Sequence, residues 1–347
     1  MARPRSILGL LFHLAALHVR RSPVRSVAAA GAVLAAALWL TRGDRAAAPA
    51  ALQVGVLRDG FVSTQRDGAG RRVIELERDG RARRTMTVRH GDDQRVVGTS
   101  TGTAVAWQQG KKIRLVRVED DREIGTWGKA ARQLCDGVAS NDARFAVGWL
   151  EADDSVWIVH GPVAGSGAAT AELTATAVGI ARNQWCGVAS AEQNVTLFWR
   201  DADRLQFTFC TRRRCSALHA TFRLDRRLPI LGFGCVSNAC LIAVRDEAGT
   251  ARLAFLTETG KTKWVVPLDT ASSEISIIGI GDAAFAVGHA TKAGAEVIRI
   301  DRSGATAVVW RDAASTGSPA LAWSSGRLLV AHHHGAALVH DTIPLPE

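Results

Sequence analysis

A repeat of about 44 residues runs through most of the sequence and limits its folding more than any other feature. Seven short apolar runs each follow a turn residue, and successive turn residues lie 42, 40, 52, 44, 44 and 44 positions apart. These turn residues are Gly60, Gly102, Asp142, Asn194, Asn238, Asp282 and Gly326. Repeats of this length built from short strands are typical of the blades of a β-propeller, in which each repeat forms one small sheet.

Each unit contains up to four expected strands. The first holds small residues, often glycine, which suits strands whose backbones crowd around a central channel. The second is the apolar run, and the third alternates apolar and polar residues as a half-buried strand does. A fourth strand follows in six units. In the seventh, Pro344 and Pro346 weaken it, so this outer strand is expected to be short or supplied from elsewhere.

These patterns predict an all-β protein with a β-propeller over residues 51–347, most simply of seven blades of up to four antiparallel strands. The alternative is a β-sandwich in which the spacing is coincidental. A separate segment, residues 1–50, precedes the repeats.

Residues 1–50 have the pattern of an export segment. Arg20, Arg21 and Arg25 precede the uncharged apolar run 27–40, and small residues follow at 46–48. We expect an N-terminal hydrophobic helix that is either a cleaved signal or an inner-membrane anchor at residues 24–41. In both cases residues 50–347 are expected outside the cytoplasm, in the periplasm or at the cell surface.

The distribution of charge argues against a nucleic-acid partner. The chain has a formal charge of +10, but residues 1–50 contribute seven arginines against one acid. The remaining 36 basic and 32 acidic residues leave only +4, with no basic stripe interleaved with aromatic residues. We therefore expect no nucleic acid to bind.

The six cysteines are expected to form three disulfides, as is common in exported proteins. Cys135 and Cys186 occupy matching places on the first strands of neighbouring units, so a bridge between blades is expected. The other four flank short turns, which pairs Cys210 with Cys215 and Cys235 with Cys240. Six buried free thiols are the alternative.

Residues 252–268, RLAFLTETGKTKWVVPL, include the fragment Gly260-Lys261-Thr262. A phosphate loop needs a further glycine five residues before the Gly-Lys pair, between a strand and a helix. That position is Phe255, inside an expected strand, and another strand follows. The stretch is therefore interpreted as a hairpin between a third and a fourth strand, with glycine at the turn.

The same stretch resembles the repeat of quinoprotein-like (PQQ-like/WD40-like) β-propellers, with Trp264 in the fourth strand against the neighbouring blade. Looser copies end in Trp127 and Trp310. The resemblance implies the propeller fold and a family that includes quinone-cofactor dehydrogenases and cofactor-free scaffolds. The dehydrogenases commonly carry an adjacent Cys pair beside the cofactor, which this sequence lacks. We therefore expect no cofactor.

The ends of the second strands hold the candidate binding residues. These residues, Trp107, Trp149, Trp199, His289 and His332, are expected at one end of the ring. They could form a recognition surface for a peptide or a glycan. The alternative is packing, because a large side chain at a repeated strand end fills the wedge between sheets.

A metal site is a further hypothesis. His332 and His334 share one face of an expected strand, and His289 occupies the matching position on the preceding unit. Three imidazoles could bind zinc or copper. Chance or packing is the alternative.

No motif assembles a nucleophile, a base and an orienting group at readable spacing. The 37 arginines against six lysines indicate a GC-rich bacterial genome. The sequence therefore favours a non-catalytic envelope propeller that binds or scaffolds a protein or a surface ligand. The alternatives are a propeller enzyme, either a quinone-dependent oxidoreductase or a hydrolase, and a metal- or glycan-binding surface protein.

Overall fold

The computed structural model describes residues 52–345. Short gaps in this range fall at 68–69, 90–93, 100–101, 138, 141–143, 163–172, 192–193, 212–214, 217–219, 225–227 and 271. The predicted N-terminal helix, its cleavage site and the anchor at 24–41 lie outside the described residues. Within the described residues, no helix has the length and apolar character needed to cross a membrane.

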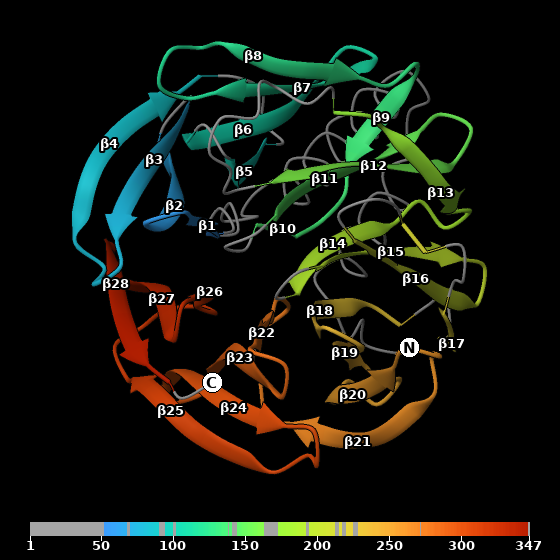
Figure 1. The fold of residues 1–347 in the computed structure, drawn as a ribbon. Coiled ribbons are helices and arrows are strands. Elements are labelled where there is room, and N and C mark those ends of the chain that lie inside the picture. Colours follow the sequence, from blue (N-terminus) through green and yellow to red (C-terminus); the bar gives the residue numbers. More distant parts are fainter. Residues whose placement is uncertain are drawn as a thin grey trace, which may run out of the picture. The chain divides into compact units, whose positions relative to one another are not determined.

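Seven antiparallel sheets form a ring, as Figure 1 shows. Blade 1 contains β1 (Gln53–Leu57), β2 (Gly60–Asp67), β3 (Gly70–Glu77) and β4 (Ala82–Val88). Blade 2 contains β5 (Gln94–Thr99), β6 (Gly102–Gln109), β7 (Lys112–Arg117) and β8 (Glu123–Trp127). Blade 3 contains β9 (Ala131–Leu134), β10 (Ala139–Ser140), β11 (Arg144–Glu151), β12 (Ser155–Pro162) and β13 (Thr176–Ile180).

The other four blades follow the same order along the chain. Blade 4 contains β14 (Cys186–Ala191), β15 (Asn194–Asp201), β16 (Arg204–Cys210) and β17 (Ala220–Arg223). Blade 5 contains β18 (Ile230–Val236), β19 (Ala239–Arg245), β20 (Ala251–Thr257) and β21 (Thr262–Leu268). Blade 6 contains β22 (Ser276–Ile280), β23 (Ala284–Thr291), β24 (Gly294–Asp301) and β25 (Thr306–Asp312), and blade 7 contains β26 (Ala320–Ser324), β27 (Arg327–His334) and β28 (Ala337–Pro344). The predicted seven-bladed all-β propeller is confirmed.

The first strand of each blade lies innermost, and its glycines allow neighbouring backbones to touch. A Cβ on Gly98 would lie 1.9 Å from the carbonyl oxygen of Val56 on the preceding blade. On Gly232 it would lie 2.0 Å from the carbonyl oxygen of Ile275. Only a residue without a side chain fits such an approach. The small residues of the repeat therefore set how closely the sheets meet at the centre.

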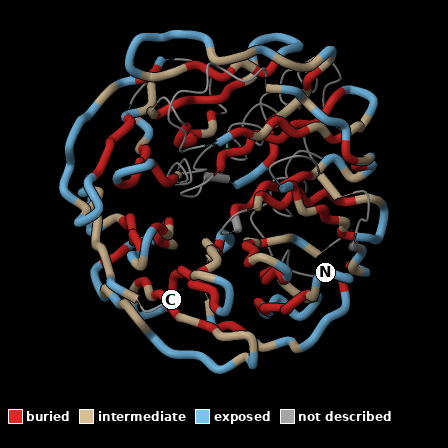
Figure 2. The backbone as a smooth tube through the Cα atoms, in the orientation of Figure 1, coloured by how far each residue is buried: buried red, intermediate tan, exposed pale blue. Residues whose placement is uncertain are grey.

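Apolar side chains fill the spaces between adjacent blades. In one cluster, Leu241 and Leu253 of blade 5 pack with Phe285 and Val287 of blade 6, and all four are buried. Figure 2 shows the buried residues on the inner and middle strands, and exposed residues along the outer strands. This explains the repeated apolar second strand, because both of its faces are covered by neighbouring sheets.

Tryptophans in the fourth strands of blades 2, 5 and 6, after the hairpin from the third strand, join these blades to the next one. Gly260 takes a φ of +77°, as the hairpin interpretation requires. Trp264 donates its indole N–H to the carbonyl oxygen of Arg302 on blade 6, over 3.1 Å. Trp127 donates to the carbonyl oxygen of Leu173 over 2.9 Å. Trp310 donates to the carboxylate of Asp341 on blade 7, also over 2.9 Å. All three tryptophans of the repeat therefore bond to the following blade.

Blades 3 and 7 depart from the four-strand pattern. The inner strand of blade 3 is broken into β9 and β10, and both pair with β11. Blade 7 has three strands, so among the described residues no segment supplies the fourth strand that Pro344 was expected to weaken. The first and last blades meet without sharing a sheet. Ser63 Oγ lies 2.7 Å from His340 Nε2, and Thr342 Oγ1 donates to the carbonyl oxygen of Asp79 over 3.1 Å.

The three predicted disulfides are confirmed. Cys135–Cys186 joins blades 3 and 4 and spans 51 residues. Cys210–Cys215 and Cys235–Cys240 each span five residues within one blade. The long-range bridge lies beside the broken inner strand of blade 3.

Candidate functional site

The five predicted binding residues lie between blades, not on an accessible face. The exposed fractions are 5% for Trp107, 0% for Trp149, 1% for Trp199, 1% for His289 and 3% for His332. Such burial matches the packing alternative, in which a large side chain fills the wedge between sheets. Contact of these residues with a ligand stays a prediction.

The three predicted metal ligands have three carboxylate partners, since His332 also lies 3.1 Å from Asp341 through Nε2. His332 Nδ1 and His334 Nδ1 lie 3.4 and 3.0 Å from the same oxygen of Asp312. His289 Nε2 lies 3.3 Å from Oε1 of Glu296, and burial lowers the pKa of this histidine. The structure thus brings His332 and His334 together and gives His289 its own partner. Their metal binding stays a prediction.

A different trio of ligand-type residues lies close together, and no sequence motif marks it. The ligand atoms of His160, Cys210 and Cys215 all lie within 4.8 Å of one another. The two sulfurs are bonded to each other, so neither is a thiolate that could bind a metal. Burial, and then the charge of Arg144, lower the pKa of His160 to about 4. This cluster is therefore a neutral imidazole packed on a disulfide.

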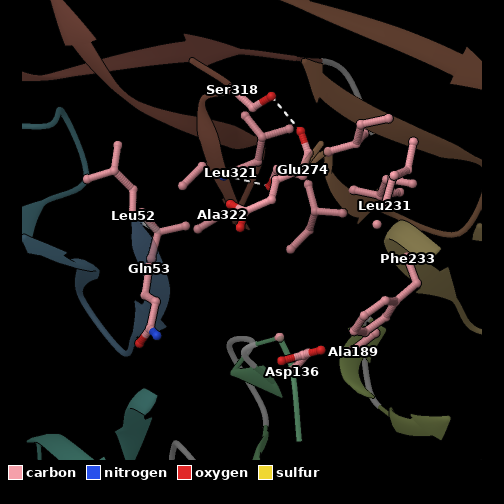
Figure 3. A pocket seen from close by; sticks show the side chains of 18 of the residues that line it. Leu52, Gln53, Asp136, Ala189, Leu231, Phe233, Glu274, Ser318, Leu321 and Ala322 are labelled. Atoms are coloured by element: carbon pink, nitrogen blue, oxygen red, sulfur yellow. Dashed lines mark hydrogen bonds between the residues drawn. The ribbon is translucent and has the colours of Figure 1, made fainter. Parts of the chain in front are cut away.

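A cavity lies where the inner strands begin. This central pocket has a volume of about 580 Å³ and is lined by residues of all seven blades. Leu52 and Gln53 come from blade 1, and Leu231 and Phe233 from blade 5. Figure 3 shows the labelled side chains around its open centre. A concave site built from many strands, with apolar walls and a few polar groups, is the usual form of a ligand pocket.

Asp136 is the polar centre of one side of the pocket. Its carboxylate accepts a hydrogen bond of 2.9 Å from Trp185 Nε1 on blade 4. Arg95 of blade 2 lies 3.4 Å from it through Nη2 and donates through Nε to the carbonyl oxygen of Cys135 over 3.0 Å. Trp185 in turn meets Phe233 edge to face, with ring centroids 5.6 Å apart. One continuous set of contacts thus runs across four blades.

The break in blade 3 positions this aspartate. After β9 the chain leaves its own sheet, and the N–H of Asp136 donates to the carbonyl oxygen of Cys186 over 2.8 Å. The N–H of Val188 donates back to the carbonyl oxygen of Asp136 over 2.8 Å. Gly137 follows with a φ of +83°, a backbone conformation that glycine adopts without strain. The disulfide between Cys135 and Cys186 then fixes the segment between β9 and β10 against blade 4.

The opposite side of the pocket is formed by blades 6 and 7. Ser318 Oγ donates to the carbonyl oxygen of Glu274 over 2.6 Å, and the N–H of Leu321 donates to Ser276 Oγ over 3.1 Å. Both bonds link the start of β26 to the segment around β22. The side chain of Glu274 is exposed at this rim.

Sequence reasoning missed the pocket because it followed the second strands. The pocket residues lie at the starts of first strands, where no motif marks them. The one available signal was a charged residue within a run of small and apolar residues, as at Asp136 in LCDGVAS.

The sequence matches no family model and no curated protein. The structure is similar to the WD40 domain of Toxoplasma gondii coronin, with a TM-score of 0.53 and 10% identity over 85% of this chain and 81% of that chain. It is similar to BBS1N, solved in complex with ARL6DN, with a TM-score of 0.52 and 13% identity over 86% and 91% of the two chains. Polysaccharide lyase Uly1 has a TM-score of 0.52 and 8% identity over 86% and 90%. At these identities the likeness establishes the fold alone, a seven-bladed propeller like those of WD40 domains.

Proposed function

We propose that this protein is a non-catalytic binding module of the cell envelope that holds a partner protein at the central pocket. The observation that carries the proposal is the pocket itself, a cavity of about 580 Å³ to which all seven blades contribute. Contacts across blades 2 to 5 and a disulfide hold one side of it in place before a ligand arrives. Such preorganisation favours affinity, because little ordering is left to the binding step.

An envelope location is supported by two independent features. The three disulfides suit an oxidising compartment outside the cytoplasm. Residues 1–50 have the composition of an export segment, with arginines before an apolar run and small residues after it. We propose that this segment either is removed or anchors the protein in the inner membrane.

A protein ligand is supported by analogy as well as by the pocket. BBS1N, a structural neighbour of this chain, was solved with ARL6DN bound. Propellers host many functions, so this analogy is weaker than the pocket geometry. We also propose that the chain is a cofactor-free relative of the quinoprotein-like propellers. The support is the Gly260 turn and the Trp264 bond to the next blade.

The test is a cross-linking pull-down of the tagged full-length protein from its native envelope. Ser273 is exposed at the pocket rim, and its side chain makes no hydrogen bond with the described residues, so Ser273→Trp blocks the mouth without touching the core. The control is Thr259→Trp, at an exposed position in the β20–β21 hairpin away from the pocket lining. We expect one protein in near-equal amount with the wild type and the control, and its loss with Ser273→Trp.

Two results would contradict the proposal. Recovery of the same amount of partner protein with Ser273→Trp as with the wild type would show that the partner does not bind at the pocket. Recovery of no protein would argue for a small ligand, to be sought by metal, quinone and glycan screens.

A further inference from the structure

The central pocket has a charge opposite to that of the whole protein. Its described lining contains three charged side chains, Arg95, Asp136 and Glu274, which is one base against two acids. The complete chain has a formal charge of +10. Within a low-dielectric cleft such a local excess of negative charge attracts a cationic ligand group.

Of the paired Arg95 and Asp136, the aspartate is the more exposed in the pocket. The guanidinium of Arg95 donates to the carbonyl oxygens of Cys135 and Gln94, over 3.0 and 3.2 Å. Its side chain is 15% exposed, whereas the side chain of Asp136 is 58% exposed. A ligand entering the pocket therefore meets the carboxylate before the guanidinium.

Glu274 supplies the second carboxylate, from the far side. Figure 3 shows Glu274 and Asp136 on opposite sides of the open centre. Glu274 is exposed, and its carboxylate has no hydrogen bond or ion pair with any residue that the structure describes. A carboxylate without a protein partner at a pocket rim is available to a ligand.

Apolar and aromatic side chains line the space between the two acids. They are contributed by blades 1, 5 and 7 and are Leu52, Leu231, Phe233 and Leu321. Trp185 adds an indole whose N–H is already donated to Asp136. A surface of this kind accommodates an aliphatic stem that ends in a cation, because the stem packs on apolar groups while the charge reaches a carboxylate.

We infer that the central pocket takes an arginine side chain presented by the partner protein. This inference rests on the proposed function and names the chemistry that the partner must carry. A guanidinium is planar and presents its donors as a fork, so it can form a bidentate pair with the exposed carboxylate of Glu274. Its aliphatic stem packs against Leu231 and Leu321.

The test uses two peptide probes of nearly equal shape. They are N-acetyl-Ala-Arg-Ala-amide and the same peptide with neutral citrulline in place of arginine. Binding to the full-length protein is measured by ligand-observed NMR. We expect the arginine peptide to bind at least about tenfold more tightly than the citrulline peptide, because a charge-assisted bond to a carboxylate is lost.

A matched pair of variants assigns the effect to the pocket. Glu274→Gln keeps the shape of an exposed side chain whose carboxylate has no partner among the described residues, so the fold should be unchanged. We expect it to weaken the arginine peptide about tenfold. Glu258→Gln makes the same change in the exposed β20–β21 turn, outside the pocket lining, and should leave binding unchanged.

The inference is overturned if both peptides bind equally, if neither binds, or if Glu274→Gln binds the arginine peptide as the wild type does. Tight binding of a neutral disaccharide such as maltose in competition with the peptide would point to a glycan instead. These failures differ from failure of the proposed function. If a partner protein is lost with Ser273→Trp but the arginine peptide is not preferred, the proposed binding function stands. Only the inference that the partner presents an arginine is then contradicted.

Discussion

Two histidines at blade contacts are held neutral by their surroundings. Burial, and then the charge of His332, lower the pKa of His340 to about 4, and burial with the nearby Arg144 does the same for His160. His340 accepts or donates the hydrogen bond with Ser63 that joins the last blade to the first. The protonation of one side chain is therefore coupled to closure of the ring.

This coupling predicts that the protein loses stability in mild acid. An unfolded histidine has a pKa near 6.5, so between about pH 6.5 and about pH 4 the unfolded chain binds more protons than the folded one. The free energy of unfolding should therefore decrease as the pH falls through this window and be unaffected by these groups above it. Urea unfolding at pH 7.5, 5.5 and 4.5 measures the effect.

His340→Gln tests the assignment, because glutamine can keep a bond to Ser63 but does not titrate. We expect it to remove part of the pH dependence. A slope in His340→Gln equal to that of the wild type would contradict the interpretation.

At the scale of the element, the inner strand is the most constrained part of a blade. Its glycines lie against the backbone of the neighbouring blade, as at Gly98 and Gly232. The repeated small residues predicted this crowding from the sequence, because side chains are excluded wherever strands meet at a centre. The constraint is steric and does not depend on the sign of φ.

Two glycine substitutions distinguish the cost of a steric clash from the cost of an unfavourable backbone conformation. Gly98→Ala places a Cβ 1.9 Å from the carbonyl oxygen of Val56, and forced overpacking of this kind should lower the free energy of unfolding by about 3 kcal/mol. Gly110 has a φ of +59°, but a Cβ at this position would meet no atom within 4 Å. Gly110→Ala should lower the free energy of unfolding by about 1 kcal/mol. Equal losses in urea titrations of the two variants would contradict the steric account.

The sequence predicted the elements better than the site. Periodic turn residues and alternating strands repeat in every blade, so seven weak signals reinforce one another. The central pocket has no such repetition, because Arg95, Asp136 and Glu274 each occur once and lie on different blades. The break between β9 and β10 at Asp136 depends on backbone hydrogen bonds to blade 4, which no local sequence pattern encodes.

At the scale of the whole molecule, the contacts between neighbouring blades differ in how strongly they are stabilised. The contact between blades 3 and 4 contains a disulfide that spans 51 residues, which in the chain-entropy account stabilises the fold by about 4 kcal/mol. The contact between blades 7 and 1 joins the two ends of the repeat, so no loop connects these blades directly, and no disulfide among the described residues bridges it. It depends on packing and on a few hydrogen bonds such as that of Thr342.

The ring should therefore open first between blades 7 and 1. We expect hydrogen exchange in peptides covering β1 and β26 to be about tenfold faster than in peptides covering β11 and β14. In the double variant Cys135→Ser/Cys186→Ser, exchange in β14 should increase while exchange in β1 stays the same. Uniform protection around the ring, measured by mass spectrometry, would contradict this order.

Every blade is built from strands that are consecutive in the chain, which has a consequence for synthesis. A ring closed by interleaving its two ends would leave its first sheet incomplete until the last residues had emerged, with an unpaired edge open to aggregation. Here the first sheet is complete once β4 has emerged, and each later sheet needs only its own stretch of about 44 residues. Such local pairing is fast to form. The protein can therefore assemble one blade at a time as it is synthesised, and the final step is only the meeting of two finished sheets.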